Sequence, residues 1–323
     1  MYYKKILEKY FKREHESVET VYIGVDEKKF DPEKYNKDEL RKKYLKIDKN
    51  KKIISYICRI SEQKRPMLLL EIVKKLIEKR QDFKVLVVGD GNLLKRMKEK
   101  AKKMNLLEYI LFLGELKNTQ EIYAISDLTI NCSLKEGLAL TSYESLSMNV
   151  PVVSSDVGGQ KELISDEVGE IVPIMQNEKD VYSEEYKAEE IEKFVIAVNK
   201  VLNNLDIYKA NCRKRICEKF TIDKMIEKMD NIFEKIYINP SKQKIENGIM
   251  LSNNKNITKE LITANLKSDE IEYKWECTEY EKKVYGRAYS VTGLNYKKEL
   301  LKERLWNVPM WRLLLKIYHK IKQ

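Results

Sequence analysis

The chain has 323 residues, a net charge of +11, a charged fraction of 35% and a hydrophobic content of 43%, which is ordinary for a globular protein. No stretch approaches the roughly 18 uninterrupted apolar residues of a membrane-spanning helix, and the basic, aromatic start of the chain lacks the pattern of a signal peptide. Five scattered cysteines and two histidines, none at zinc-ligand spacing, argue against a structural zinc site and predict reduced thiols. We therefore expect a cytoplasmic location.

The basic surplus is concentrated toward the C-terminal end. Residues 241–323 hold 17 Lys and Arg against 10 Asp and Glu. A nucleic-acid-binding protein usually carries its basic surface on the folded domain, so we expect no nucleic-acid partner. The surplus indicates either contact with an anionic membrane surface or solubility alone.

Short apolar runs alternate with amphipathic stretches between residues 53 and 172. The runs are rich in β-branched residues, are too short for helices, and are bounded by Gly, Asp, Ser or Asn. They span residues 53–57, 85–88, 110–113, 128–130, 151–153 and 171–172. Near-continuous apolarity is typical of parallel strands covered on both faces, and spacings such as Met67, Leu70, Val73 and Ile77 predict helices between them. The alternation predicts an α/β fold with a doubly wound parallel sheet of six strands.

The C-terminal part of the chain predicts helices and a linker. Residues 187–237 indicate two or three amphipathic helices, with one opening at residues 189–191 and a break at Asp206 or Asn211. Residues 241–268 are polar and without period, as in a linker, and residues 270–303 are ambiguous. An apolar stripe over residues 306–322 predicts a helical C-terminal extension.

Polar residues and glycines follow four of the predicted strands. Ligands of open α/β sheets bind where the carboxyl ends of the strands meet helix N-termini, and an Arg with a Lys suits a diphosphate. Each signal alone has a plainer explanation as a solvated charge, a turn or a salt-bridge partner. Their coincidence at one side of the sheet favours a phosphate-bearing ligand. The residues concerned are Arg59, Lys64, Gly89, Gly91, Glu136, Glu144, Gly158, Gly159 and Glu162.

Residues 136–144 (EGLALTSYE), followed by Ser145-Leu146 and by residues 150–153 (VPVV), resemble the signature of retaining glycosyltransferase family 4. That signature has two glutamates separated by seven residues, then a small-residue helix and a Pro-Val-Val strand. Gly24-Val25-Asp26 with Phe30 resembles the hinge through which that family's chain enters its second domain. The resemblance extends from about Gly24 to Val172, and it departs at Cys58 and Ala139, where the family usually has Gly.

The resemblance implies the C-terminal, donor-binding domain of a GT-B fold, and it implies roles for individual residues. Arg59 and Lys64 would neutralise the diphosphate of the donor, and Glu136 would hold hydroxyls of the transferred sugar; these three are the candidate catalytic residues. Glu144 would accept hydrogen bonds from the ribose. The other candidate donor-binding residues are Gly89, Gly91, Leu116, Gly137, Leu138, Ala139 and Leu140, where backbone N–H groups of residues 138–140 would cap the diphosphate from a helix N-terminus. The resemblance implies no metal and no other cofactor.

The resemblance also divides the chain into three parts. Residues 1–23 would be the remnant of an N-terminal acceptor domain, residues 24–239 the nucleotide-sugar-binding domain, and residues 240–323 a linker and basic helical tail. The acceptor half is then either lost by truncation, supplied by a partner chain, or missing because the sequence begins at a false start.

We expect a retaining glycosyltransferase that uses a nucleoside-diphosphate (NDP) sugar and a glycan or lipid-linked acceptor in surface polysaccharide or glycoconjugate synthesis. The alternative is a non-catalytic nucleotide-sugar-binding fragment or subunit. Residues 304–323 are basic and aromatic, and they allow two interpretations. They would form either an amphipathic helix that binds the inner face of the cell membrane or a helix that packs on the protein's own core.

Overall fold

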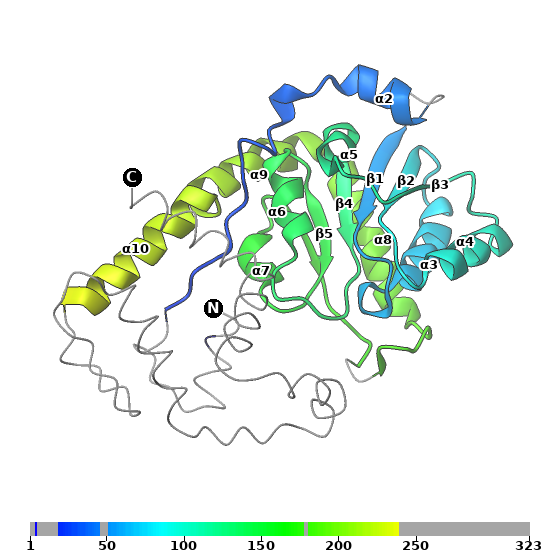
Figure 1. Cartoon of the computed structure of the whole chain (residues 1–323). Coiled ribbons are helices and arrows are strands. Elements are labelled where there is room, and N and C mark those ends of the chain that lie inside the picture. The colour runs from blue at the N-terminus through cyan, green and yellow to red at the C-terminus, as the bar shows by residue number, and fades with distance from the viewer. Residues whose placement is uncertain (1–3, 5–18, 46–50, 178–179, 239–323) are drawn as a thin grey trace, which may run out of the picture. The chain divides into compact units, whose positions relative to one another are not determined.

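The computed structural model of the chain is shown in Figure 1 and describes residue 4 and residues 19–45, 51–177 and 180–238. Six strands form one parallel sheet in the order β3-β2-β1-β4-β5-β6. The strands are β1 (Lys52–Ile57), β2 (Phe83–Val88), β3 (Ile110–Gly114), β4 (Leu128–Asn131), β5 (Val152–Ser155) and β6 (Gly169–Val172). This confirms the doubly wound α/β fold and all six predicted strands.

In the described part of the chain, one α-helix follows each strand, and further helices precede the first strand and follow the last of these helices. They are α2 (Lys37–Leu45), α3 (Pro66–Ile77), α4 (Leu94–Lys103), α5 (Thr119–Ile125), α6 (Leu140–Ser147), α7 (Gln160–Leu163), α8 (Ala188–Asn203), α9 (Leu205–Lys219) and α10 (Ile222–Ile238). Two short 3-10 helices, η2 (Pro32–Lys34) and η3 (Glu62–Lys64), precede α2 and α3. Residues 239–323 lie outside the described part, and so do the linker and the basic tail predicted there.

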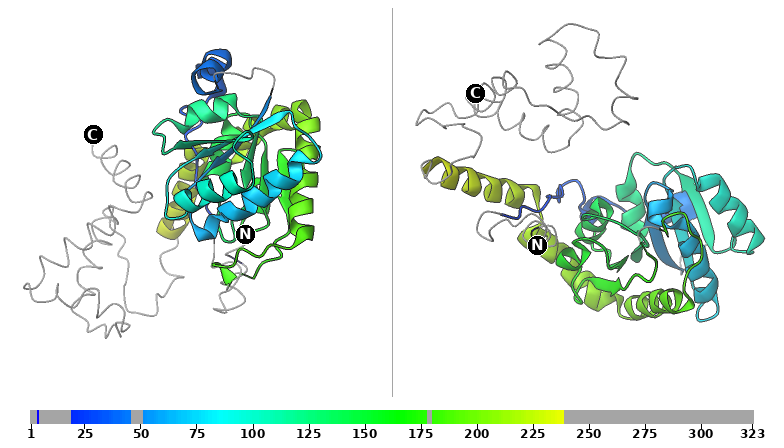
Figure 2. Two further views of the ribbon diagram at one scale, coloured as in Figure 1. Left: turned by 90° about the vertical axis from the view of Figure 1, so that its right-hand side faces the viewer. Right: turned by 90° about the horizontal axis from the view of Figure 1, so that it is seen from below.

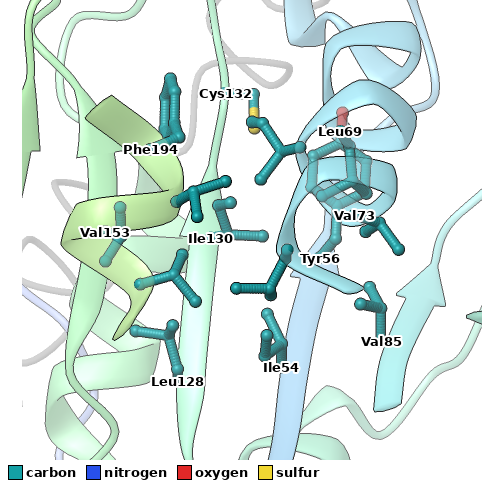
Figure 3. Packing of buried hydrophobic residues seen from close by; sticks show 14 of the residues in the cluster. Ile54, Tyr56, Leu69, Val73, Val85, Leu128, Ile130, Cys132, Val153 and Phe194 are labelled. Carbon is teal, nitrogen blue, oxygen red and sulfur yellow. The ribbon is translucent and has the colours of Figure 1, made fainter. Parts of the chain in front are cut away.

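Alternating strand residues separate the core into two layers, because successive side chains of a strand point to opposite faces. Val85 and Val87 contribute to one cluster with residues of α3 and α8, and Leu86 and Val88 contribute to the other with residues of α5, α6 and α9. Figure 3 shows the first cluster, in which Leu69 and Val73 of α3 lie over Tyr56 of β1. Both faces of the sheet are therefore dry, as the apolar strands predict.

The predicted break after the first C-terminal helix is misplaced by two or more residues. Helix α8 ends at Asn203, and Asn204 closes it by donating its side-chain amide to Lys200 O at 2.8 Å. Asn211 lies inside α9, where its amide contacts Ile207 O at 3.1 Å. Sequence alone does not separate these cases because Asn and Asp near a helix end are all compatible with a break.

Asp127 fastens α2 and α9 to the amino-terminal edge of the sheet. Its side chain is only 6% exposed and forms ion pairs with Arg41 at 3.1 Å, Lys209 at 2.9 Å and Lys37 at 3.4 Å. It also accepts the N–H of Ile53 at 2.9 Å. This edge is opposite to the carboxyl ends of the strands, so the network supports the fold without contributing to the predicted site.

The last described helix, α10, begins on the domain and extends away from the sheet (Figures 1 and 2). Its start is joined to the hinge segment, where Val25 bridges to Thr221. Among the residues that the structure describes, no helix has the length and apolarity needed to cross a membrane.

Candidate functional site at the sheet switch point

The loops after β1 and β4 lie side by side at the point where the strand order reverses. Strands β1 and β4 are neighbours in the sheet although β2 and β3 separate them in the chain. Leu134 N donates to Gln63 O at 2.8 Å, and the Gln63 amide donates to Lys135 O at 2.6 Å. Crevices between such loops are where open α/β sheets bind ligands.

Lys64 and Glu136 meet across this switch point. The Lys64 ammonium forms an ion pair and a hydrogen bond with Glu136 Oε1, and both side chains are mostly buried, at 22% and 10% exposure. The Ser133 hydroxyl lies 2.7 Å from the same Oε1 and 2.7 Å from Asn131 Oδ1. An ammonium has three donors and a carboxylate has two oxygens, so Lys64 and Glu136 keep capacity for further partners. Lys64 is the last residue of η3, two residues before α3 begins at Pro66.

Arg59 lies two residues after the end of β1 and is exposed. Within the described part of the chain, its side chain forms no hydrogen bond or ion pair. The next loop reaches the same region, because Ile60 N donates to Asp90 O at 2.9 Å. A Cβ atom on Gly89 would lie 1.9 Å from Cys58 O, and one on Gly91 would lie 2.4 Å from Ile60 O. Both glycines are therefore required for the close approach of the β1 and β2 loops.

The loop after β4 leads into α6 with an uncapped helix start. Helix α6 begins at Leu140 after Ala139, whose methyl group cannot cap the N-terminal N–H groups. Residues 138–140 thus lie at the N-terminus of α6, with Ala139 as its N-cap residue, and their contact with a diphosphate stays a prediction. Leu140 is 51% exposed.

The two glycines after β5, Gly158 and Gly159, pack on this loop. Gly159 N donates to Gly137 O at 2.8 Å. Gly158 has φ +54°, and a Cβ atom there would lie 2.1 Å from Glu136 O. The structure thus brings the β5 loop against the backbone of Glu136 and Gly137. Glu162, on α7 directly after these glycines, accepts a 2.6 Å hydrogen bond from the Tyr22 hydroxyl.

Glu144 lies on α6 and is held by a tyrosine that the sequence did not single out. The Tyr123 hydroxyl, on α5, donates to Glu144 Oε2 at 3.0 Å. Burial raises the pKa of Glu144, although the Tyr123 hydrogen bond and the charge of Lys29 act in the opposite direction. Leu116, in the loop after β3, is partly buried against the same side of the core as Tyr123.

Arg65 is the largest side chain among those most fully buried, and the sequence pattern gave no sign of it. Its guanidinium donates to Cys132 O at 2.5 Å, to Ser155 Oγ at 3.0 Å and to Glu190 Oε1 at 2.7 Å. Arg65 is 1% exposed and Glu190 is 0% exposed. An Arg next to a Lys before a helix is ordinarily a surface charge, so no local signal distinguishes this buried one.

No cluster of three or more His, Cys, Asp or Glu side chains suited to a metal ion occurs in the described residues. At the switch point Lys64 supplies a cation and Glu136 an anion. Arg59 lies in the same loop as Lys64, and Glu144 lies on α6, the helix that follows the loop of Glu136. Such a set can neutralise phosphate groups and accept hydrogen bonds from hydroxyls.

Parts of the chain are similar in sequence to known proteins. Residues 36–184 match the family described as glycosyl transferases group 1. The chain is 30% identical over 221 residues to an Escherichia coli UDP-Gal:alpha-D-GlcNAc-diphosphoundecaprenol alpha-1,3-galactosyltransferase, covering 67% of this chain and 54% of the relative. The chain spans about half the length of the curated relatives it matches.

Solved structures share the fold. A glycosyltransferase from Rickettsia africae has a TM-score of 0.61 at 22% identity, covering 74% of this chain and 62% of that chain. Anabaena HepE in complex with UDP has a TM-score of 0.56 at 15% identity, covering 69% and 58% of the two chains. Residues 36–184 are therefore similar in sequence to glycosyl transferases group 1, and the Rossmann-like sheet has the fold of solved glycosyltransferases.

Proposed function

We propose that this chain binds the NDP-sugar donor of a retaining glycosyltransferase of family 4. The observation that carries the proposal is the pairing of Lys64 with Glu136 at the switch point of the sheet, with Arg59 in the same loop as Lys64. In this proposal Lys64 would contact the diphosphate and Glu136, beside it, would accept from sugar hydroxyls. The E. coli relative is named for a UDP-Gal donor, and HepE holds UDP, so UDP is the first nucleotide to test.

In the proposed reaction, the bond between the anomeric carbon and the diphosphate oxygen breaks, and the acceptor oxygen bonds to the same face of that carbon. The acceptor proton passes to an oxygen of the leaving diphosphate. Negative charge grows on the diphosphate as the sugar leaves, and cations positioned in advance stabilise that charge most effectively. Arg59 and Lys64 would do this, assisted by the N–H groups around Leu138, Ala139 and Leu140. The two cations supply the neutralisation, so we propose that no metal is needed.

The donor hydroxyls have two proposed carboxylate partners. Glu136 would accept hydrogen bonds from the sugar, using the oxygen that Lys64 and Ser133 leave free. Glu144 would accept from the ribose with Oε1, because Tyr123 contacts Oε2. Gly89, Gly91, Leu116 and Gly137 would line the donor. The acceptor would be a glycan or a lipid-linked sugar, in line with the diphosphoundecaprenol substrate in the E. coli relative's name.

Binding and transfer are tested separately. Calorimetry with UDP, GDP and their sugars should show micromolar to millimolar affinity for one nucleotide family, and affinity should be unchanged by EDTA. Glu136→Gln should weaken the NDP-sugar about tenfold while the NDP alone loses less than twofold, because a lost hydrogen bond to a charged group costs about 1.5–3 kcal/mol. Equal losses for both ligands would contradict the assignment of Glu136 to the sugar.

Transfer requires an acceptor, so NDP-sugar turnover with lipid-linked acceptors is measured next. Proton NMR of the product gives the anomeric configuration, and inversion would contradict the proposed mechanism. Tight donor binding without transfer or hydrolysis would favour the alternative, a non-catalytic donor-binding fragment or subunit that needs an acceptor domain from a partner chain.

A peripheral membrane location is the last part of the proposal. Residues 304–323 contain five Lys and Arg, no acidic residue, and two tryptophans, a composition that suits an anionic lipid surface. Sedimentation with vesicles containing anionic lipid should recover the full chain but not a chain lacking residues 304–323. Equal recovery of both would contradict it.

A further inference from the structure

Outside the candidate donor site, the domain buries an ion pair between Arg65 and Glu190. Both side chains are at most 1% exposed, and their ion pair measures 2.7 Å. Moving a charge out of water costs several kcal/mol per ion, which mutual attraction offsets only with excellent geometry. Arg65 also has φ 51°, a left-handed backbone conformation that is costly for a residue with a side chain. Arg65 therefore combines a buried charge with an unfavourable backbone conformation.

The contacts of Arg65 form a closed network, which we call the Arg65 ring, with residues of the candidate site. Arg65 follows Lys64 in the chain, and its Nε donates to the carbonyl of Cys132. The next residue, Ser133, contacts the carboxylate of Glu136 at 2.7 Å. Glu136 in turn pairs with Lys64. A displacement of Arg65 would therefore move Lys64 relative to Glu136.

Glu190 connects the Arg65 ring to other parts of the domain through its two carboxylate oxygens. Its Oε1 holds Arg65, and its Oε2 accepts the N–H of Met175, in the segment after β6, at 3.2 Å. Arg65 also reaches Ser155 at the end of β5. The pair thus connects the loop after β1 with the ends of β4 and β5 and with the chain after β6.

We propose that Arg65 and Glu190 are positioning residues that fix Lys64 for contact with the diphosphate of the donor. A buried ion pair contributes little net stability compared with apolar residues of similar volume, so its effect is expected on binding rather than on folding. The inference rests on the proposed function, because it requires the ligand to carry a diphosphate. Neither residue touches the ligand.

The test replaces both charges with methionine, in the full chain. The variant Arg65→Met/Glu190→Met should remain folded, because removing both partners leaves no unpaired buried charge. Its affinity for the nucleoside diphosphate that wild type binds, UDP or GDP, should fall at least tenfold. Affinity for the corresponding nucleoside, uridine or guanosine, should stay within twofold, because the nucleoside has no phosphate for Lys64 to contact.

Three comparisons make the outcome decisive. The control Lys193→Met/Glu189→Met removes an exposed ion pair of 2.8 Å from the same helix, α8, and should change neither affinity. Lys64→Met should weaken the diphosphate strongly in wild type and little in the double variant, since positioning residues act through Lys64. Arg65→Lys keeps the charge but loses the planar fork; it supplies the diphosphate-to-nucleoside comparison if the double variant does not fold.

Unchanged diphosphate affinity would overturn the inference, and so would equal losses for diphosphate and nucleoside. Full additivity of Lys64→Met with the double variant would overturn it as well. A wild-type chain that binds neither UDP nor GDP would instead contradict the proposed function itself.

Discussion

The hydroxyl of Tyr123, on α5, lies 3.0 Å from Oε2 of Glu144, on α6. The hydrogen bond joins the two helices, and the two residues are 21 positions apart in the chain. The same hydroxyl lies 3.2 Å from Thr141 O, so one proton serves two acceptors. Burial of Glu144 outweighs this hydrogen bond and the nearby charge of Lys29, and the pKa of the carboxyl is raised. Ionisation of Glu144 therefore costs the folded domain stability.

Glu144→Gln should stabilise the fold near pH 7 and weaken nucleotide binding. A carboxyl whose folded pKa is raised favours folding below its unfolded pKa of about 4.3, and that benefit is lost as pH rises through the folded pKa. The neutral amide avoids this loss and still accepts from Tyr123. Thermal unfolding should show a higher Tm for the variant at pH 7, with the difference disappearing toward pH 4.

Glu144→Gln should also lower UDP affinity about tenfold if the carboxylate accepts from the ribose. The exposed Glu99 on α4 provides the control, since Glu99→Gln should alter neither the Tm nor the affinity. A lower Tm for Glu144→Gln at pH 7 would contradict the electrostatic argument.

Asp127→Asn should show the opposite dependence on pH. Burial alone would raise the pKa of Asp127, but the charges of Lys209 and Lys37 and the Ile53 N–H outweigh burial and lower it. The stability that Asp127 contributes is present above an unfolded pKa of about 3.9 and is lost as pH falls through the lower, folded pKa. Denaturant unfolding at pH 7 should show a loss of about 3 kcal/mol.

The exposed Asp223, which lies 4.0 Å from Lys28, is the matched control for Asp127. Asp223→Asn should change stability by less than about 0.5 kcal/mol. If Asp127→Asn and Asp223→Asn lowered the unfolding free energy equally, the burial of Asp127 could not explain its effect on stability.

Gly158→Ala and Gly114→Ala separate backbone strain from steric overlap. Both glycines have positive φ, but a Cβ atom on Gly114 meets nothing within 4 Å, whereas one on Gly158 overlaps Glu136 O. Gly114→Ala should cost about 1–2 kcal/mol, and Gly158→Ala about 3 kcal/mol or more, since overpacking is added. Gly158→Ala should also weaken NDP-sugar binding because Glu136 moves. Similar unfolding free energies for the two variants would exclude this close contact.

Arg59→Met should weaken UDP binding about tenfold at low salt and reduce its salt dependence, since an exposed charge acts through a screened field. Lys102→Met removes another exposed cation, on α4, and should change affinity less than twofold. Calorimetry at two salt concentrations provides the measurement. If both substitutions weakened UDP binding equally, affinity would depend only on the net charge of the protein, and Arg59 would have no specific role.

The six strands and the polar strand ends were predictable from the sequence because their signals are local. Apolar runs such as residues 85–88 need cover on both faces, and parallel strands place all their carboxyl ends at one edge. The sequence pattern therefore suffices to assign Arg59, Lys64 and Glu136 to one edge of the sheet. Strand order was needed to show that the loops of Lys64 and Glu136 are direct neighbours.

The contacts that hold these residues in place could not be predicted. Arg65 looks like a solvated cation in sequence, and its partner Glu190 is 125 positions away. Tyr123 and Ser133 likewise acquire their roles from helix and loop packing. The break at Asn204 was missed because several polar residues nearby are equally able to end a helix.

The sequence by itself determined the fold class and the side of the sheet on which charged residues gather, because hydrophobic periodicity and glycine placement are written along the chain. Tertiary structure alone decided which charges are buried, which pair with one another, and how Lys64 is held against Glu136. Burial and pairing depend on distances between residues far apart in sequence, and only the packed sheet sets those distances.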